Sequence, residues 1–308
     1  MSTIEIAEQR WRTTLAVTLP GSADAPAVRQ AERIMVGEVN RLEKAASRFR
    51  ADSEISAVNR DAGQWVRASA LLVQLVEVAL AAAESTDGLV NPCLGRQVDA
   101  AGYGTWAAGD VAVLDLGIPV AAGAGMWREV EVVAGRVRIP SGVALDLGAT
   151  AKAWLADEVA ERISDELELD VIANMGGDLR VIVGAPGWVV SADHEVPGLP
   201  ERVIGISDGG LATSGQGRRR WLTTSGPAHH LIDPRTGRSS QTGWWAVSAL
   251  AASATAANVA ATAGMLLDDA APGWFADRGL HGLFTRWSGS GRATARTVGQ
   301  WPGMEHAA

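Results

Sequence analysis

The residues best suited to proton transfer in this chain are two adjacent histidines, His229 and His230, at the start of the stretch His229–Gly237. Histidine has the unperturbed side-chain pKa nearest neutrality, which suits it to general acid–base work. Within this stretch, Asp-Pro is followed three residues later by Gly, which predicts a tight turn. A strand that runs into this turn would deliver His230 to its mouth. The alternative is a strand end with two surface histidines, and the stretch alone does not decide between them.

A second candidate block is Asp146-Leu147-Gly148-Ala149-Thr150-Ala151-Lys152, where a strand is expected to end on an acid and a helix to begin. Helix N-termini favour phosphate because their backbone amides point outward. Lys152 falls in the first turn of the expected helix and can reach a phosphate as well. The alternative is that Asp146 only caps the helix and Lys152 is a solvated charge.

A third candidate is the pair Asn258 and Thr262 in an Ala-rich segment. Their spacing of four puts both side chains on one helix face. Small neighbouring residues allow other backbone to approach closely, and two oxygen-bearing side chains can ligate a hard cation. The alternative is a pair of polar groups that make hydrogen bonds inside the core.

Three further blocks are interpreted as turns and caps. Asn174–Asp178 contains paired glycines and is predicted to be a hairpin turn without a ligand contact. Ala212–Gln216 is expected to follow a strand, and it lacks the Gly-x-Ser-x-Gly pattern of a nucleophile elbow. Asp52–Asn59 is typical of a short capped helix with Asn59 as its C-cap.

The elements that must carry these residues indicate an α+β fold with two lobes, because the predicted helices gather early and the strands late. Most strands are expected in short β-rich runs after the helix at 148–166, and a hairpin is expected at 128–140. The principal helices are predicted at 26–49, 69–84, 148–166 and 254–267. We treat residues 1–308 as a single two-lobed domain, with a tail that is frayed from about residue 299.

Composition excludes several classes of function. The net charge of -8 argues against bulk electrostatic binding to nucleic acid or to an anionic membrane. Cys93 is the only cysteine, so no intrachain disulfide forms. Residues 239–267 carry no charge, but they are rich in Ala, Ser and Thr and are interpreted as a buried strand and a helix, not an integral membrane segment. The first residues show no signal-peptide or lipid-anchor pattern, so the chain as it stands is expected to be cytoplasmic.

Taken together and in this order, the blocks resemble the ApbE family of FAD:protein FMN transferases. The resemblance extends from about Arg12 to Trp287 and is carried by Ser47–Phe49, Asp52–Asn59, Asp146–Lys152, Asn174–Asp178, Ala212–Gly215, His229–Gly237 and Ala257–Ala263. It implies a T-fold-like architecture of mixed and antiparallel sheets with flanking helices. It also implies binding of FAD between two lobes. Members of this family are often exported, whereas the first residues of this chain show no export signal.

The activity that the resemblance implies is transfer of FMN from FAD to a Ser or Thr hydroxyl of a partner flavoprotein, with release of AMP. His230 would transfer the proton, and Mg²⁺ would be held by the Ala149 carbonyl with Asn258 and Thr262. The positions that would contact FAD are Phe49, Asn59, Leu89, Val90, Asn91, Asp146, Lys152 and Leu231. Such chemistry requires charge stabilisation, positioning and modest proton transfer.

Two departures from the family pattern each remove a carboxylate. The family usually has Phe-Asp-Pro where this chain has Val90-Asn91-Pro92, and Asp where this chain has Asn258. We therefore expect weak Mg²⁺ binding that depends on the FAD pyrophosphate. Two other functions stay open: a non-catalytic FAD-binding or flavin-trafficking protein, and an FAD pyrophosphatase.

Overall fold

The computed structural model describes residues 2–104, 124–184, 188–192, 202–224, 226–287 and 293–302. The chain divides into two compact units. The first comprises Met1–Asn40, Lys152–Gly215 and Thr242–Ala308, and the second comprises Arg41–Ala151 and Gln216–Gln241.

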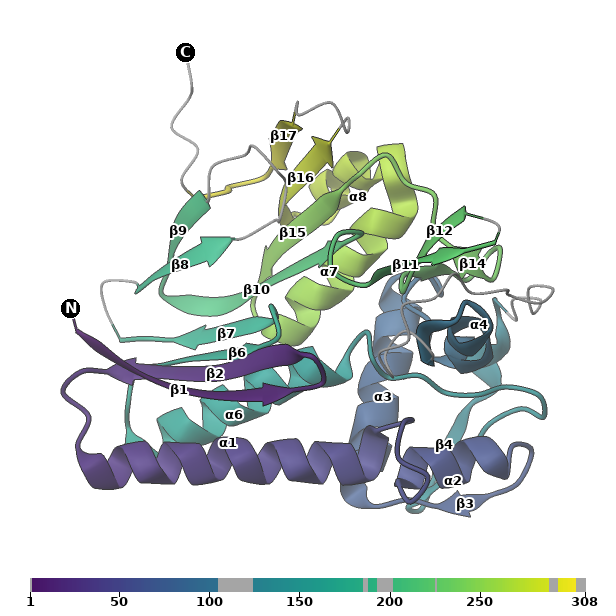
Figure 1. The fold of residues 1–308 in the computed structure, drawn as a ribbon, viewed down its shortest axis with the longest axis horizontal. Helices are drawn as coiled ribbons and strands as arrows, with labels where there is room; N and C mark the ends of the chain where they lie inside the picture. The colour runs from purple at the N-terminus through teal and green to yellow at the C-terminus, as the bar shows by residue number, and fades with distance from the viewer. Residues whose placement is uncertain are drawn as a thin grey trace. The chain divides into compact units, whose positions relative to one another are not determined.

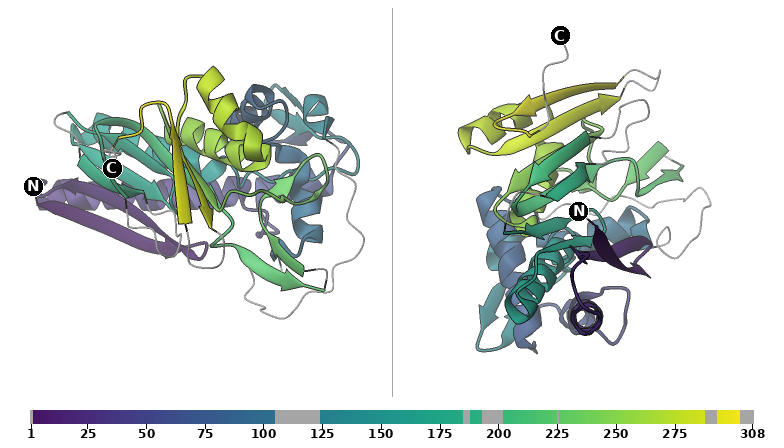
Figure 2. Two further views of the ribbon diagram at one scale, coloured as in Figure 1. Left: turned by 90° about the horizontal axis from the view of Figure 1, so that it is seen from above. Right: turned by 90° about the vertical axis from the view of Figure 1, so that its left-hand side faces the viewer.

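The first unit is built on an eight-stranded sheet in which every neighbouring pair is antiparallel (Figure 1). The strands, in their order across the sheet, are β1 (Thr3–Arg10), β2 (Thr13–Pro20), β6 (Val171–Met175), β7 (Leu179–Ile182), β10 (Asp208–Gly215), β15 (Ala246–Ala251), β16 (His281–Trp287) and β17 (Ala293–Val298). Segments from both ends of the chain therefore form the opposite edges of this sheet, β1 at one and β17 at the other (Figure 2).

The helices of this unit are α6 (Ala151–Leu167), α7 (Ala254–Leu267), α8 (Ala271–Asp277) and the 3-10 turn η3 (Asp268–Ala270), with the first part of α1 (Ala25–Ala46). Arg162 of α6 forms an ion pair with the buried Glu38 of α1, which holds the two helices together. α7 packs against β10 and β15.

Successive residues of β10 serve opposite faces of the sheet, as strand geometry requires. Gly210 lies against the start of α7, where a Cβ would overlap backbone atoms of Ser253 and Ala254. Ser214, four residues on, is hydrogen-bonded to Thr262 of α7. Leu211 instead belongs to a hydrophobic cluster outside α7. β10 therefore joins the helix that carries Asn258 and Thr262 to the rest of the core.

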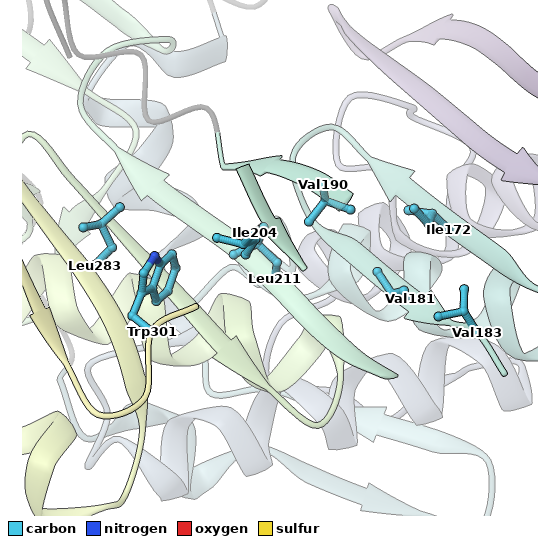
Figure 3. Packing of buried hydrophobic residues seen from close by; sticks show 8 residues of the cluster. All are labelled: Ile172, Val181, Val183, Val190, Ile204, Leu211, Leu283 and Trp301. Atoms are coloured by element: carbon cyan, nitrogen blue, oxygen red, sulfur yellow. The ribbon is translucent and has the colours of Figure 1, made fainter. Parts of the chain in front are cut away.

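That hydrophobic cluster links the central strands to the hairpin of β8 (Trp188–Ala192) and β9 (Arg202–Ile206) (Figure 3). It consists of Ile172, Val181, Val183, Val190, Ile204, Leu211, Leu283 and Trp301. Trp301 is only 7% exposed, so the chain is packed at this position although we expected fraying from about residue 299. Residues 303–308 of the expected tail lie outside the described residues.

The second unit has short strands and no large sheet among its described residues. Its helices are α2 (Glu54–Arg60), α3 (Ala70–Ser85), α4 (Gly95–Ala100) and the 3-10 turns η1 (Pro92–Leu94) and η2 (Met126–Glu129). β3 (Val66–Arg67), β5 (Arg136–Arg138) and β4 (Glu131–Val133) form a small antiparallel sheet. The described residues of this unit also contain two hairpins: β11 (Arg220–Thr223) with β12 (Gly226–His229), and β13 (Ile232–Asp233) with β14 (Arg238–Ser239).

The α+β class is confirmed, and α7 begins and ends where the sequence predicted a helix. The uncharged stretch 239–267 is, as expected, largely a strand and a helix, and no helix of the described residues is long and apolar enough to cross a membrane. One expectation was wrong: residues 212–215 lie within β10 and not after a strand. The first strand, β1, was not expected.

Candidate functional site

An aromatic cluster in the second unit surrounds one of the two histidines. The ring of Tyr103 lies 6.0 Å from that of Phe49, 5.9 Å from Trp221 and 6.4 Å from His230, measured between centroids. Phe49 is 58% exposed, which is unusual for a large apolar side chain next to other rings. The cluster thus offers an accessible aromatic face, of the kind that binds a flat ring system.

Arg48 lies among these rings, with its guanidinium carbon 4.7 Å from the Phe49 centroid and 5.5 Å from that of Tyr103. Its Nε pairs with Asp146 Oδ2 at 2.6 Å, and its Nη1 pairs with Asp99. Burial alone would lower the pKa of Arg48, but the two carboxylates outweigh burial and the pKa is raised. Arg48 therefore stays charged and ties Asp146 to the aromatic cluster.

The two histidines occupy different environments at the end of β12. His229 is buried, with Nε2 2.9 Å from the Ser240 carbonyl oxygen. The Leu231 amide donates to His229 Nδ1 at 3.3 Å, so we assign the proton to Nε2. Burial lowers the pKa of His229, which keeps this ring neutral. His230 is half-buried beside Tyr103, so it is the more accessible of the two histidines, and its role in proton transfer remains a prediction.

The turn after these histidines is locked by its own residues. The Thr236 and Gly237 amides donate to the Asp233 carbonyl oxygen. Arg235 donates to Asp233 Oδ1 from its backbone amide and from Nε, and to Asp233 Oδ2 from Nη2. Burial would raise the pKa of Asp233, but Arg235 outweighs this and the pKa is lowered. The predicted tight turn is present, and its acid and arginine hold the loop that follows His230.

Several positions that the sequence assigned to FAD contact are engaged with the backbone of the second unit. Asn59 donates from Nδ2 to the Leu145 carbonyl at 2.9 Å and accepts from the Leu145 amide at 2.7 Å. It is not the C-cap of α2, a position that Asp61 occupies. Asn91 caps η1 by accepting from the Cys93 amide at 2.8 Å. Both amides thus position the chain around the site.

The remaining apolar positions of that set differ in exposure. Val90 and Leu231 are buried, whereas Leu89 is half-buried. Contact between these side chains and FAD remains a prediction.

The Asp146–Lys152 block forms a turn that leads into α6. Asp146 Oδ1 accepts from the Gly148 amide at 2.7 Å, and Ala149 lies exposed in the turn itself. The helix begins at Ala151, so Lys152 is in its first turn as expected. Ala149 belongs to the second unit and Lys152 to the first.

A second polar cluster lies within the first unit and contains Lys152, Asp178, Asn258, Thr262 and Ser214. Lys152 Nζ is 3.3 Å from Asp178 Oδ2, and Asn258 Nδ2 donates to Asp178 Oδ1 at 2.7 Å. Thr262 Oγ1 is 3.5 Å from Asn258 Oδ1 and 2.9 Å from Ser214 Oγ. Four of these five side chains are buried, so the cluster is a network and not a surface contact.

The α7 helix is held in place by two groups at its N-terminus. Ser253 Oγ accepts from the Ala256 amide at 3.1 Å, which is an ordinary N-cap. Asp157 of α6 accepts from the Ala254 amide at 2.7 Å, and from the Thr255 amide and hydroxyl at 2.9 and 2.7 Å. The carboxylate therefore fixes the helix on which Asn258 and Thr262 lie.

The oxygen donors on α7 suit a hard cation in type. Asn258 Oδ1 and Thr262 Oγ1 are neighbours on one helix face, and both are neutral. Among the described residues no group of three His, Cys, Asp or Glu side chains could hold a metal ion. These donors fit Mg²⁺ only as partners of an anionic ligand, and a joint site with the Ala149 carbonyl remains a prediction.

Sequence reasoning missed four residues of these clusters, and one of them, Trp221, was expected only as part of a strand. Asp178 was interpreted as part of a turn, and that turn exists, with Gly176 and Gly177 at φ 76° and 103°. The acid directly after the paired glycines was the available signal. Arg48 and Tyr103 were also missed, although Arg48 precedes Phe49 and Tyr103 is the only tyrosine of the chain.

Comparison with known proteins relates this arrangement to one family. Residues 10–284 match the model of the ApbE family. The FAD:protein FMN transferase of Treponema pallidum (strain Nichols) is 30% identical over 249 residues, which are 73% of this chain and 68% of that protein.

Two solved structures share the fold. The ApbE protein from Thermotoga maritima superposes with a TM-score of 0.80 at 24% identity, covering 95% of this chain and 96% of that one. The flavinyl transferase ApbE of Pseudomonas stutzeri gives a TM-score of 0.82 at 19% identity, covering 96% and 95%. With the family model matching nearly the whole length, this chain belongs to the ApbE family.

Proposed function

We propose that this protein transfers FMN from FAD to a Ser or Thr hydroxyl of a partner flavoprotein and releases AMP. The observation that carries the proposal is the family match over residues 10–284, which includes every residue of both clusters. A relative that matches over most of this chain bears the name FAD:protein FMN transferase.

The aromatic cluster is suited to the flavin. Phe49 exposes its ring beside Tyr103, and a flat aromatic ligand can pack on such a face by offset stacking or edge contact. Arg48 anchors Asp146 and the rings together, so this part of the site is organised before any ligand binds.

His230 is suited to take the proton of the acceptor hydroxyl. In the proposed reaction, this hydroxyl oxygen attacks the phosphorus of the FMN half, the pyrophosphate P–O bond breaks, and AMP leaves with the bonding electrons. The displaced proton passes to a ring nitrogen of His230. The neighbouring His229 has both nitrogens committed to the backbone, so it cannot share this role.

The polar cluster of the first unit is suited to the pyrophosphate. Lys152 supplies a positive charge, and Asn258 Oδ1 and Thr262 Oγ1, with the carbonyl of Ala149, would hold Mg²⁺. When bound, Mg²⁺ would neutralise the pyrophosphate charge that develops as AMP leaves. With neutral protein ligands, its affinity must depend on the phosphate oxygens of FAD.

The test is incubation of the purified protein with FAD, Mg²⁺ and candidate flavoproteins from the same genome, followed by intact-mass measurement. The expected result is an acceptor heavier by one FMN unit and an equal amount of AMP. The matched control is the same acceptor with its target Ser or Thr replaced by Ala.

The other outcomes identify the rival functions. Free FMN and AMP without a modified acceptor would indicate an FAD pyrophosphatase. Binding of FAD with no turnover by any acceptor would indicate a flavin-binding or flavin-trafficking protein.

A further inference from the structure

The buried carboxylate of Asp178 has no part in the function as stated so far. Asp178 follows the Gly176-Gly177 turn between β6 and β7 and is 3% exposed. One of its oxygens faces Lys152 Nζ at 3.3 Å and the other accepts from Asn258 Nδ2 at 2.7 Å. It therefore joins a residue at the start of α6 to a residue in the middle of α7.

The contact with Asp178 decides which way the Asn258 amide points. An ionised carboxylate only accepts hydrogen bonds, so Asn258 must turn its NH₂ group toward Asp178. The Asn258 Oδ1 atom then faces Thr262, at 3.5 Å, which is the outer limit for a hydrogen bond. The Thr262 hydroxyl has a closer partner in Ser214 at 2.9 Å. The Asn258 oxygen is thus oriented by Asp178 but only weakly engaged by its other neighbour.

The charges of the cluster permit only one carboxylate. Lys152 and Asp178 offset one another, and Asn258 is neutral. An aspartate at position 258 would bring a second carboxylate to a contact that is 2.7 Å long in this chain, and two like charges at such a distance repel one another. An acid at 178 is therefore compatible with an amide at 258, or an amide at 178 with an acid at 258.

We propose that Asp178 is a positioning residue that carries the negative charge of this cluster in place of residue 258 and orients the Asn258 carbonyl oxygen toward a bound cation. The cation and its anionic partner, Mg²⁺ and FAD, rest on the proposed function. The claim that one of positions 178 and 258 is an acid and the other an amide rests on the contacts alone.

The test compares four proteins: the natural chain, Asp178→Asn, Asn258→Asp, and the exchanged double variant Asp178→Asn/Asn258→Asp. Melting temperature is measured without ligand, and FAD affinity is measured with and without Mg²⁺. Each single variant should melt below the natural chain, because one removes the carboxylate that faces Lys152 Nζ and the other places two carboxylates together. The exchanged variant should recover most of the loss, since it again contains one acid and one amide.

The ratio of FAD affinity with Mg²⁺ to that without it separates positioning from mere stability. This ratio should fall about tenfold in Asp178→Asn and return in the exchanged variant, a tenfold change in Kd being about 1.4 kcal/mol. Thr213→Ala is the matched control. Thr213 lies beside Ser214 on β10, and this substitution removes the hydrogen bond from Thr213 to Ser248 of β15. It should leave the ratio unchanged.

The proposal is overturned if the melting-temperature losses of the two single substitutions add in the exchanged variant. It is also overturned if Asp178→Asn keeps the full effect of Mg²⁺ on FAD affinity. If the single variants do not fold, folding of the exchanged variant supports the pairing and its failure to fold overturns it. The measurements of melting temperature and FAD affinity use no acceptor protein, so their results can be interpreted even if the transfer assay fails. If the natural chain does not bind FAD, the proposed function fails while the recovery of melting temperature still tests the charge exchange.

Discussion

His229 and His230 are adjacent in sequence but differ in burial, and in the proposed function only His230 transfers a proton. Replacing His230 with Ala should reduce FMN transfer by about 10²–10⁴-fold, the usual effect of losing a general base. FAD affinity should change little, because the rings of Phe49 and Tyr103 remain. Acceptor mass measured over time gives the transfer rate, and calorimetric titration gives the affinity. His229→Gln is the control, and the assignment is wrong if this variant loses transfer while His230→Ala keeps it.

His229 has a structural role that should be visible in the pH dependence of stability. Burial lowers its pKa in the folded state below the ordinary value of 6.5, which applies in the unfolded chain. The unfolded state therefore takes up a proton first as the pH falls, and the contribution of His229 is complete above 6.5 and lost as the pH falls through the lower folded pKa. Denaturant unfolding at several pH values should show a smaller acid-side loss in His229→Gln than in the natural chain. Equal slopes for the two proteins would contradict this role.

At the scale of the elements, the position of α7 depends on a carboxylate from α6. Asp157→Ala removes the acceptor for the Ala254 and Thr255 amides, and a buried donor left unpaired costs about 1–3 kcal/mol. The free energy of unfolding should fall by about that amount. Asp165→Ala, which removes an exposed acid of the same helix, should change it by less than about 0.5 kcal/mol. Equal effects of the two substitutions would show that Asp157 does not anchor α7.

An element could be predicted from the sequence when its own residues determine it, and was missed when it depends on distant parts of the chain. The bounds of α7 were predictable because a serine cap and a run of small helix-forming residues lie in its own sequence. β10 was missed because Gly209 and Gly210 weaken a strand pattern, and the reason for Gly210 is the close approach of α7 from 43 residues further on. β1 was missed because it is an edge strand with one polar, exposed face and little buried surface.

At the scale of the whole molecule, the residue types of the site were predictable but their partners were not. His230, Lys152, Asn258 and Thr262 stand in recognisable blocks. The contact of Asp178 with Asn258 spans 80 residues, and no local pattern reveals it. The orientation of the Asn258 amide depends on that contact. From the sequence alone, Asn258→Asp would either restore the carboxylate that is usual in the family or bury an unpaired charge. With Asp178 in view, the same substitution brings two carboxylates together.

The whole-molecule prediction concerns the size of the ligand. The aromatic cluster is proposed to contact the flavin, and Lys152, Asn258 and Thr262 the pyrophosphate side, so affinity should rise from riboflavin to FMN to FAD in the presence of Mg²⁺. Phe49→Ala should weaken all three ligands to a similar degree, by about 0.5–1.5 kcal/mol for one aromatic contact. Lys152→Gln keeps a donor for Asp178 but removes the charge, so it should weaken FMN and FAD while leaving riboflavin unchanged. Calorimetric titration of the three proteins with the three ligands measures this pattern. Equal affinity of the natural chain for riboflavin and FAD would mean that the polar cluster around Lys152 contributes nothing to binding.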